Sequence, residues 1–162
     1  YEAIHKVRLE SWLATYPDPN HGATEENLSK RLKAGMSDPE KNEQYKKQMD
    51  NDPNHIYRVT QDQETIVGFI HFHIQENINE FKGIYISPSH TGKGIGGMLV
   101  KDALKEVKND NKWTVQCVKN NPYARKFYKR LGFKVTKEDS FKIDEEASLP
   151  TVWMETEKLN IS

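Results

Sequence analysis

The stretch Ser87-Pro-Ser-His-Thr-Gly-Lys-Gly-Ile-Gly-Gly97 lies between an apolar segment that predicts a strand and an amphipathic segment that predicts a helix. Glycine stands at every second position from Gly92 to Gly96, and Gly97 follows. This spacing leaves backbone N–H groups uncovered and directs them to one point near a helix N-terminus. The stretch therefore predicts a main-chain anion site that holds a phosphate-bearing ligand. A plain turn would not require three alternating glycines, because each one carries a cost in conformational entropy.

The glycine pattern alone fits more than one phosphate-binding turn. A Walker loop places Lys and then Ser or Thr after its last glycine, whereas Lys93 lies between two glycines. Gly92, Gly94 and Gly97 do match the dinucleotide fingerprint G-x-G-x-x-G. That fingerprint also expects an acidic residue at the end of the next strand, where this chain has Lys119. A nucleotide-binding module that shares only the glycine turn stays open as an alternative.

Hydrophobic periodicity divides the rest of the chain into strands and helices. Strands are predicted at His55–Val59, Thr65–Gln75, Glu80–Ser87, Trp113–Val118, Phe133–Thr136 and Thr151–Glu157. Helices are predicted at Ile4–Thr15, from Thr24 to Lys33, from Gly94 to Lys108, and from the Asn121 N-cap to Gly132. The polar segment from Ala34 to Asn54 is predicted to be a solvated loop or a surface helix.

The order of these elements predicts the fold class. A strand, the glycine turn, a helix and a strand in succession form a β-α-β crossover, so those two strands should be parallel. The last two strands should form an antiparallel pair. We therefore expect an α+β fold in α/β/α layers, with a mixed, mostly antiparallel sheet and one parallel β-α-β crossover. A single domain should cover residues 1–162, and a first strand is expected before Tyr1, because Tyr1 falls inside a helical pattern.

Composition limits the classes of function. The chain has 24 basic and 24 acidic residues and no net charge, which argues against general nucleic-acid binding. No long apolar run and no signal peptide is visible, so we expect no membrane partner. The single cysteine, Cys117, excludes an internal disulfide and fits a reducing compartment. A cytoplasmic protein is the expectation, and a homodimer stays open.

Several motifs together resemble those of the GNAT N-acetyltransferase superfamily. They are Ile84-Tyr-Ile-Ser-Pro88, Thr91-Gly-Lys-Gly-Ile-Gly96, Asn121-Pro-Tyr-Ala124 and Phe127-Tyr-Lys-Arg-Leu-Gly-Phe133. Each motif is short, but their order and spacing over about fifty residues make the combination specific. The resemblance covers at least Thr65 to Phe133, and Val7-Arg-Leu-Glu-Ser-Trp12 looks more weakly like the family's first helix.

The resemblance implies acetyl-CoA as the ligand and a GNAT-like acyl-CoA transferase fold. The pyrophosphate would lie on the main-chain amides from Gly92 to Gly97, and the pantetheine arm along the strand that ends at Ile86. The residues implied in cofactor binding are Ile84, Tyr85, Ile86, Thr91, Gly92, Lys93, Gly94, Ile95, Gly96, Gly97, Asn121, Ala124 and Tyr128. The family usually has Gln or Arg where Thr91 stands, and Lys93 is expected to supply the missing cation.

The same resemblance implies direct acetyl transfer to a primary amine. Deprotonating a lysine-like amine at pH 7 costs roughly 4–5 kcal/mol, so a general base is useful. Glu80 is the leading base, because many family members have Glu at the matching place; a solvated strand-end carboxylate is the alternative. His71 and His73 are further candidates, and no third ligand accompanies them to bind a metal. The oxyanion would meet a backbone N–H near Ile86, where the family's strand carries a bulge.

Tyr128 is implied as the acid that protonates the departing thiolate, although its place on an apolar helix stripe also fits a core aromatic. Cys117 is expected to be a buried thiol rather than a nucleophile. The candidate acceptor contacts are Trp12, Tyr16, His21, His71 and His73. The acceptor would be a small-molecule amine, an amino acid or a peptide. A non-catalytic acyl-CoA-binding or sensing domain is the alternative to an enzyme.

Overall fold

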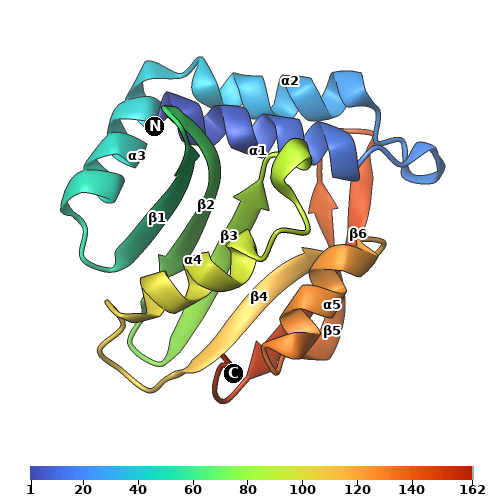
Figure 1. Cartoon of the computed structure of the whole chain (residues 1–162). Coiled ribbons are helices and arrows are strands. Elements are labelled where there is room, and N and C mark those ends of the chain that lie inside the picture. The colour runs from blue at the N-terminus through green and yellow to red at the C-terminus, as the bar shows by residue number, and fades with distance from the viewer. Residues whose placement is uncertain (162) are drawn as a thin grey trace.

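A computed structural model describes residues 1–161 as helices packed on a central sheet (Figure 1). The helices are α1 (Glu2–Thr15), α2 (Glu25–Met36), α3 (Pro39–Asn51), α4 (Ile95–Leu104) and α5 (Pro122–Arg130), with 3-10 turns η1 (Pro19–His21) and η2 (Pro88–His90). The strands are β1 (His55–Asp62), β2 (Thr65–His73), β3 (Ile78–Ile86), β4 (Lys112–Val118), β5 (Lys134–Lys142) and β6 (Ser148–Thr156). None of the helices within residues 1–161 is long and apolar enough to cross a membrane.

The six strands form one mixed sheet in the order β1-β2-β3-β4-β6-β5. Every neighbouring pair is antiparallel except β3 and β4, which are parallel and are joined through the crossover helix α4. The predicted fold class is therefore confirmed, including the single parallel β-α-β crossover.

Helices cover both faces of the sheet because β2 is apolar on both sides. Phe69 lies in one cluster with Ile4 and Val7 of α1. The next residue, Ile70, points to the opposite face and lies in the main core cluster with Val100 of α4. Figure 1 shows the resulting layers, with α1 and α2 on one side of the sheet and α4 and α5 on the other.

Strands β3 and β4 diverge after a short paired segment. They are paired only where 78–80 of β3 lies beside 112–114 of β4. Beyond Glu80, β3 stays paired with β2 as far as Ile86, whereas no strand within residues 1–161 pairs with its other edge. The divergence opens the middle of the sheet.

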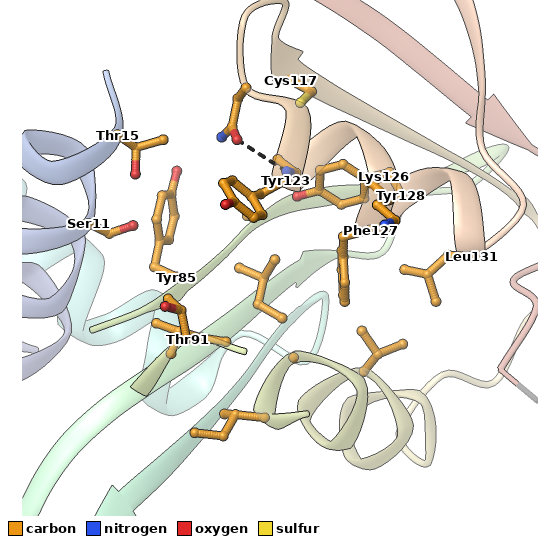
Figure 2. Close-up of a pocket in the computed structure, with 18 of the residues that line it drawn as sticks. Ser11, Thr15, Tyr85, Thr91, Cys117, Tyr123, Lys126, Phe127, Tyr128 and Leu131 are labelled. Carbon is orange, nitrogen blue, oxygen red and sulfur yellow. Dashed lines mark hydrogen bonds between the residues drawn. The ribbon is translucent and has the colours of Figure 1, made fainter. Parts of the chain in front are cut away.

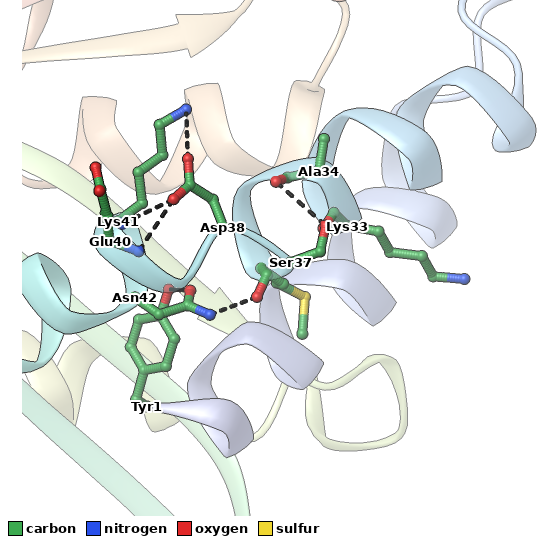
Figure 3. A network of polar contacts seen from close by, with 9 residues as sticks. Tyr1, Lys33, Ala34, Ser37, Asp38, Glu40, Lys41 and Asn42 are labelled. Carbon is green, nitrogen blue, oxygen red and sulfur yellow. Dashed lines mark hydrogen bonds and ion pairs between the residues drawn. The ribbon is translucent and has the colours of Figure 1, made fainter.

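The polar segment after α2 is a surface helix, α3, and not a loop. Asp38 begins this helix by accepting hydrogen bonds from the backbone N–H groups of Glu40 (3.1 Å) and Lys41 (3.2 Å). The hydroxyl of Tyr1 donates to Asn42 Oδ1 (2.7 Å), which connects α3 to the start of the chain. Figure 3 shows these contacts around the first turn of α3.

The strand predicted at Phe133–Thr136 is longer than expected. Strand β5 continues to Lys142, although most of its side chains are exposed. It is held as a strand by its pairing with β6 along nearly its whole length. A hydrophobic pattern could not predict this extension, because the exposed strand has none.

Candidate active site

A cavity of about 1330 Å³ lies where β3 and β4 diverge. Its walls come from the glycine turn and α4, from β3 and β4, from α5, and from the C-terminal part of α1. Figure 2 shows Ser11 of α1, Tyr85 of β3 and Tyr128 of α5 around the same space. The cavity therefore joins the predicted anion site to the predicted acceptor region.

The glycine turn presents bare main chain to this cavity. Gly92 and Gly94 both have a φ of +77°, in the left-handed region that favours glycine. A β-carbon at either position, or at Gly97, would meet no atom within 4 Å, so the space above the turn is open. Gly94 is also the N-cap of α4, which brings the positive end of the helix dipole to the cavity.

Gly96 has a different role from the other glycines of the turn. A β-carbon there would lie 3.1 Å from the ring of Phe127 and 3.4 Å from Ile84. Gly96 therefore allows α4 to approach α5 and β3 closely, which positions the first turn of α4 against the cavity.

Of Thr91 and Lys93, only Thr91 lines the cavity. Thr91 lines the cavity, but its hydroxyl donates to the backbone oxygen of Pro88 (3.0 Å). Lys93 is not one of the residues that line the cavity, although Gly92 and Gly94 on either side of it are.

Positive charge at the cavity comes from residues that the sequence analysis missed. They are Lys82, Lys101, Lys126 and Arg130. Lys126 and Arg130 are four residues apart, so they share one face of α5, and this spacing was the only signal in the sequence. The four cations suit a ligand that carries several phosphate charges.

The middle of β3 forms one wall of the cavity through Ile84, Tyr85 and Ile86. The ring of Tyr85 lies back over Gly83, where a β-carbon would be only 2.6 Å from Cε2 of that ring. Gly83 thus allows the aromatic ring to lie along its own strand, and a larger side chain there would displace it.

The bulge of β3 is not where the sequence analysis expected it. The register with β2 shifts between His71 and Phe72, which leaves Lys82 without a partner on β2. The expectation of a bulge near Ile86 is therefore wrong by four residues. The hydrophobic pattern could not reveal this, because the bulge depends on how the two strands pair.

Tyr128 and Asn121 both reach the cavity from α5. Tyr128 is only 6% exposed, and burial raises the pKa of its hydroxyl well above 10.0, so this group stays protonated at neutral pH. The side-chain oxygen of Asn121 accepts a hydrogen bond from the backbone N–H of Ala124 (3.1 Å). Asn121 and Ala124 line the cavity as well.

Two further titratable groups at the cavity are kept neutral by burial. Burial raises the pKa of the Cys117 thiol to about 11, so it is a buried thiol and not a nucleophilic thiolate. Burial also raises the pKa of Tyr16 well above its ordinary value. A covalent acetyl-cysteine is therefore no part of the chemistry that this arrangement supports.

The end of the cavity beside α1 is polar but uncharged. Ser11 and Thr15 line it from α1 and Tyr16 from the C-cap that follows, and Gln116 and Asn120 line it from β4 and the segment after it. Tyr16 is thus the predicted acceptor contact that the structure brings to the cavity. Ser11 and Thr15 were missed, although they lie one helical turn apart on α1.

Trp12 and His21, also expected at the acceptor, lie elsewhere. The ring of Trp12 packs edge-on against Tyr16 (5.1 Å) and Phe141 (5.6 Å). His21 lies in the exposed loop after α1, with Nδ1 2.8 Å from Asp18 Oδ2.

Glu80, His71 and His73 are outside the cavity lining as well. Glu80 Oε1 accepts from Lys82 Nζ (3.2 Å). His71 Nε2 lies 2.8 Å from His55 Nδ1, and His73 stacks on the same His55 ring (4.2 Å between centroids). Burial lowers the pKa of His71 to about 2, so this ring is a neutral part of a packed cluster.

The comparisons with known proteins agree with this geometry. The sequence matches the Acetyltransferase (GNAT) family over residues 23–133, and no curated protein matches it. The chain is similar to the PaiA N-acetyltransferase from Thermoplasma acidophilum in complex with coenzyme A. The identity is 25% and the TM-score 0.71, with 95% of this chain and 90% of that chain covered.

Two other similar structures show the fold at lower identity. The ribosomal-protein alanine N-acetyltransferase from Escherichia coli has 13% identity and a TM-score of 0.57, covering 71% of this chain and 74% of that one. A spermidine N-acetyltransferase chimera from Vibrio cholerae and hSSAT has 22% identity and a TM-score of 0.56, covering 72% and 74%. The family match spans more than half of the sequence, so the chain belongs to the acetyltransferase (GNAT) family, whose acetyl donor is acetyl-CoA.

Proposed function

We propose that this protein transfers an acetyl group directly from acetyl-CoA to a primary amine. The observation that carries this proposal is the path of the cavity. It runs from the open glycine turn, past the gap between β3 and β4, to the uncharged polar end at α1. A donor with a pyrophosphate near one end and a thioester at the other fits this path. The family match and the CoA complex of the PaiA N-acetyltransferase support the same donor.

The groups along the path suit each part of the donor. The amides from Gly92 to Gly97, at the N-terminus of α4, would bind the pyrophosphate. Lys101, Lys126 and Arg130 would balance further phosphate charge. The edge of β3 would hydrogen-bond the pantetheine amides, because β4 leaves that edge free beyond Glu80.

Tyr128 would act as the general acid at the reacting end. As the amine nitrogen bonds to the thioester carbonyl carbon and the C–S bond breaks, the tyrosine hydroxyl would give its proton to the sulfur. Burial keeps this hydroxyl protonated. The same burial disfavours a free thiolate, so the pKa values of proton donor and proton acceptor shift in the same direction.

Glu80 would take the proton of the amine through water. Among the lining residues within 1–161 there is no Asp, Glu or His, so none of those side chains can act directly. Glu80 Oε1 lies 3.2 Å from Nζ of Lys82, which does line the cavity. Glu80→Gln should lower kcat/KM by about tenfold or more at pH 7, and much less near pH 10, where amines lose the proton unaided. An equal loss at both pH values would remove this role.

Release of free CoA from acetyl-CoA in the presence of a panel of amines tests the activity. We expect at least one small amine, amino acid or peptide to accelerate release above simple hydrolysis. Should CoA bind while no amine accelerates release, the chain is a non-catalytic acyl-CoA-binding domain. Thermal unfolding with CoA, ATP or NAD tests the ligand class, because stabilisation follows RT ln(1 + [L]/Kd). Stabilisation by ATP or NAD but not by CoA would contradict the proposal.

A further inference from the structure

Arg8 of α1 is a partly buried cation without a counter-charge. Its guanidinium carbon lies 5.3 Å from the centroid of the Phe69 ring and 5.6 Å from that of the Tyr85 ring. Within residues 1–161, its side chain makes no ion pair and no hydrogen bond. Arg58, by contrast, is paired with two carboxylates at 3.1 and 3.0 Å.

Arg8 lies beside the end of the cavity where the acceptor is expected. Ser11 is one helical turn further along the same face of α1, and it lines the cavity. Tyr85, whose ring the guanidinium covers, lines the cavity too. Arg8 itself is not one of the lining residues, so it would reach an acceptor at the α1 end past the ring of Tyr85.

The electrostatics of this region favour an anion. Every charged residue that lines the cavity in the described part of the chain is basic. Burial lowers the pKa of His71 to about 2 and that of His5 to about 4, and the charge of Arg8 adds to both shifts. Both rings are thus neutral at pH 7. The charge of Arg8 therefore reaches both rings, and no carboxylate within residues 1–161 forms an ion pair with it.

The chemistry of guanidinium narrows the choice of anion. Its charge persists at physiological pH, so removing it partly from water without a partner is unfavourable. The two rings contact the cation but accept no conventional hydrogen bond, so its N–H groups stay available. Two parallel N–H groups of a guanidinium match the two oxygens of a carboxylate.

We infer that Arg8 binds a carboxylate of the acceptor, which is therefore an amino acid or another small amine that carries a carboxylate. This inference rests on the proposed N-acetyltransferase function and makes Arg8 a specificity-determining residue. It also implies discrimination against polycations. Spermidine should be a poor acceptor, because the described lining residues offer no carboxylate to hold its charges.

Two matched acceptor pairs test the inference: L-glutamate against L-glutamine, and L-alanine against L-alaninol. Each pair removes one carboxylate charge with little change in size. The unmodified protein should prefer the carboxylate in at least one pair by about tenfold or more in kcat/KM, mainly through KM. Arg8→Gln should bring that ratio close to one while CoA affinity is unchanged, and Arg8→Lys should keep part of the preference.

Arg31→Gln is the matched control. Arg31 also lies over an aromatic ring, 5.3 Å from the centroid of Phe141, but Phe141 does not line the cavity, whereas Tyr85 beside Arg8 does. Its removal should leave the acceptor ratio unchanged. Thermal unfolding and the Kd of CoA establish that each variant is folded.

Equal acceptor preference in the unmodified protein and Arg8→Gln would overturn the inference. Faster acetylation of spermidine than of every carboxylate-bearing amine would do the same. If no amine at all accelerates the release of CoA, the proposed enzyme function fails. Calorimetric titration of L-glutamate and L-alanine into the CoA-bound protein then tests whether Arg8 binds a carboxylate. Binding that Arg8→Gln abolishes would then support the carboxylate site, and no binding would exclude it.

Discussion

At the scale of single residues, Tyr128 combines a core position with a place at the cavity, and the sequence presented the core aromatic and the proposed acid as alternatives. Its ring packs edge-on against Phe81 (5.3 Å) and Phe127 (5.5 Å), as a core aromatic does. The same side chain lines the cavity. Because ring packing and hydroxyl chemistry use different parts of the side chain, one substitution can separate them.

Tyr128→Phe should keep the fold and the affinity for CoA but lower kcat by about 10²-fold or more. The ring contacts are retained, and only the proton donor is lost. The rate of CoA release at saturating acetyl-CoA and amine gives kcat, and calorimetry gives the Kd of CoA. Tyr45→Phe, at a 42% exposed position of α3, is the control and should change neither quantity. An unchanged kcat in Tyr128→Phe would remove its role as the acid.

His71 should make the fold sensitive to acid. Burial lowers its pKa to about 2, so below about pH 6.5 the unfolded chain takes up a proton that the folded chain does not. The stability due to neutral His71 is therefore present above pH 6.5 and is lost as the pH falls. Between pH 6.5 and 5 the loss should be about 2 kcal/mol.

Urea unfolding at pH 7 and pH 5 measures this loss. His71→Phe should remove most of it, because the ring remains but no longer titrates. His21→Phe, in the exposed loop after α1, should retain it. The same loss in His71→Phe as in the unmodified protein would show that other groups cause the acid sensitivity.

At the scale of elements, two adjacent glycines in the first turn of α4 differ in what surrounds them. Gly96 packs against other residues of the protein, whereas Gly97 faces the open space proposed for the ligand. Gly96→Ala would bring a methyl group to 3.1 Å from Phe127, so it should destabilise the fold by about 1–3 kcal/mol. A methyl group at Gly97 meets no protein atom within 4 Å. Gly97→Ala should therefore keep or raise stability by up to about 1 kcal/mol, but should weaken CoA binding where the turn is open.

Unfolding in urea and calorimetric titration with CoA distinguish the two variants. Gly96→Ala should show its main effect in the urea midpoint, and Gly97→Ala in the Kd. Gly35→Ala is the control: a β-carbon at this position of α2 also meets no atom within 4 Å, and the affinity for CoA should stay unchanged. A loss of stability without loss of affinity in Gly97→Ala would place the ligand away from this turn.

At the scale of the whole molecule, the sequence predicted those elements whose structure depends on residues nearby in the chain. The alternating apolar residues of β2, the glycine turn and the Asn121 cap each depend on their own neighbours, so the crossover and the last helix could be predicted. The exposed strand β5 could not, because only its pairing with β6 holds it. The place of Glu80 relative to the cavity likewise depends on where β3 and β4 separate.

The zero net charge of the whole chain conceals a separation of charge. The charged residues that line the cavity within 1–161 are all basic, whereas acidic residues such as Glu43 of α3 pair with cations elsewhere. The affinity for CoA should therefore fall as salt rises from about 50 to about 300 mM, since a shorter Debye length screens these contacts. The double variant Lys126→Gln/Arg130→Gln should lower affinity at low salt and flatten this dependence.

The double variant Lys41→Gln/Lys47→Gln is the control for that measurement. It removes the same charge from α3, where the two lysines pair with Asp38 (3.6 Å) and Glu43 (3.9 Å). Calorimetry at low and high salt should give the same two CoA affinities as for the unmodified protein. If CoA affinity does not depend on salt in any of the three proteins, the basic side chains do not contact the phosphates. The main-chain amides of the glycine turn would then hold the ligand's charge without them.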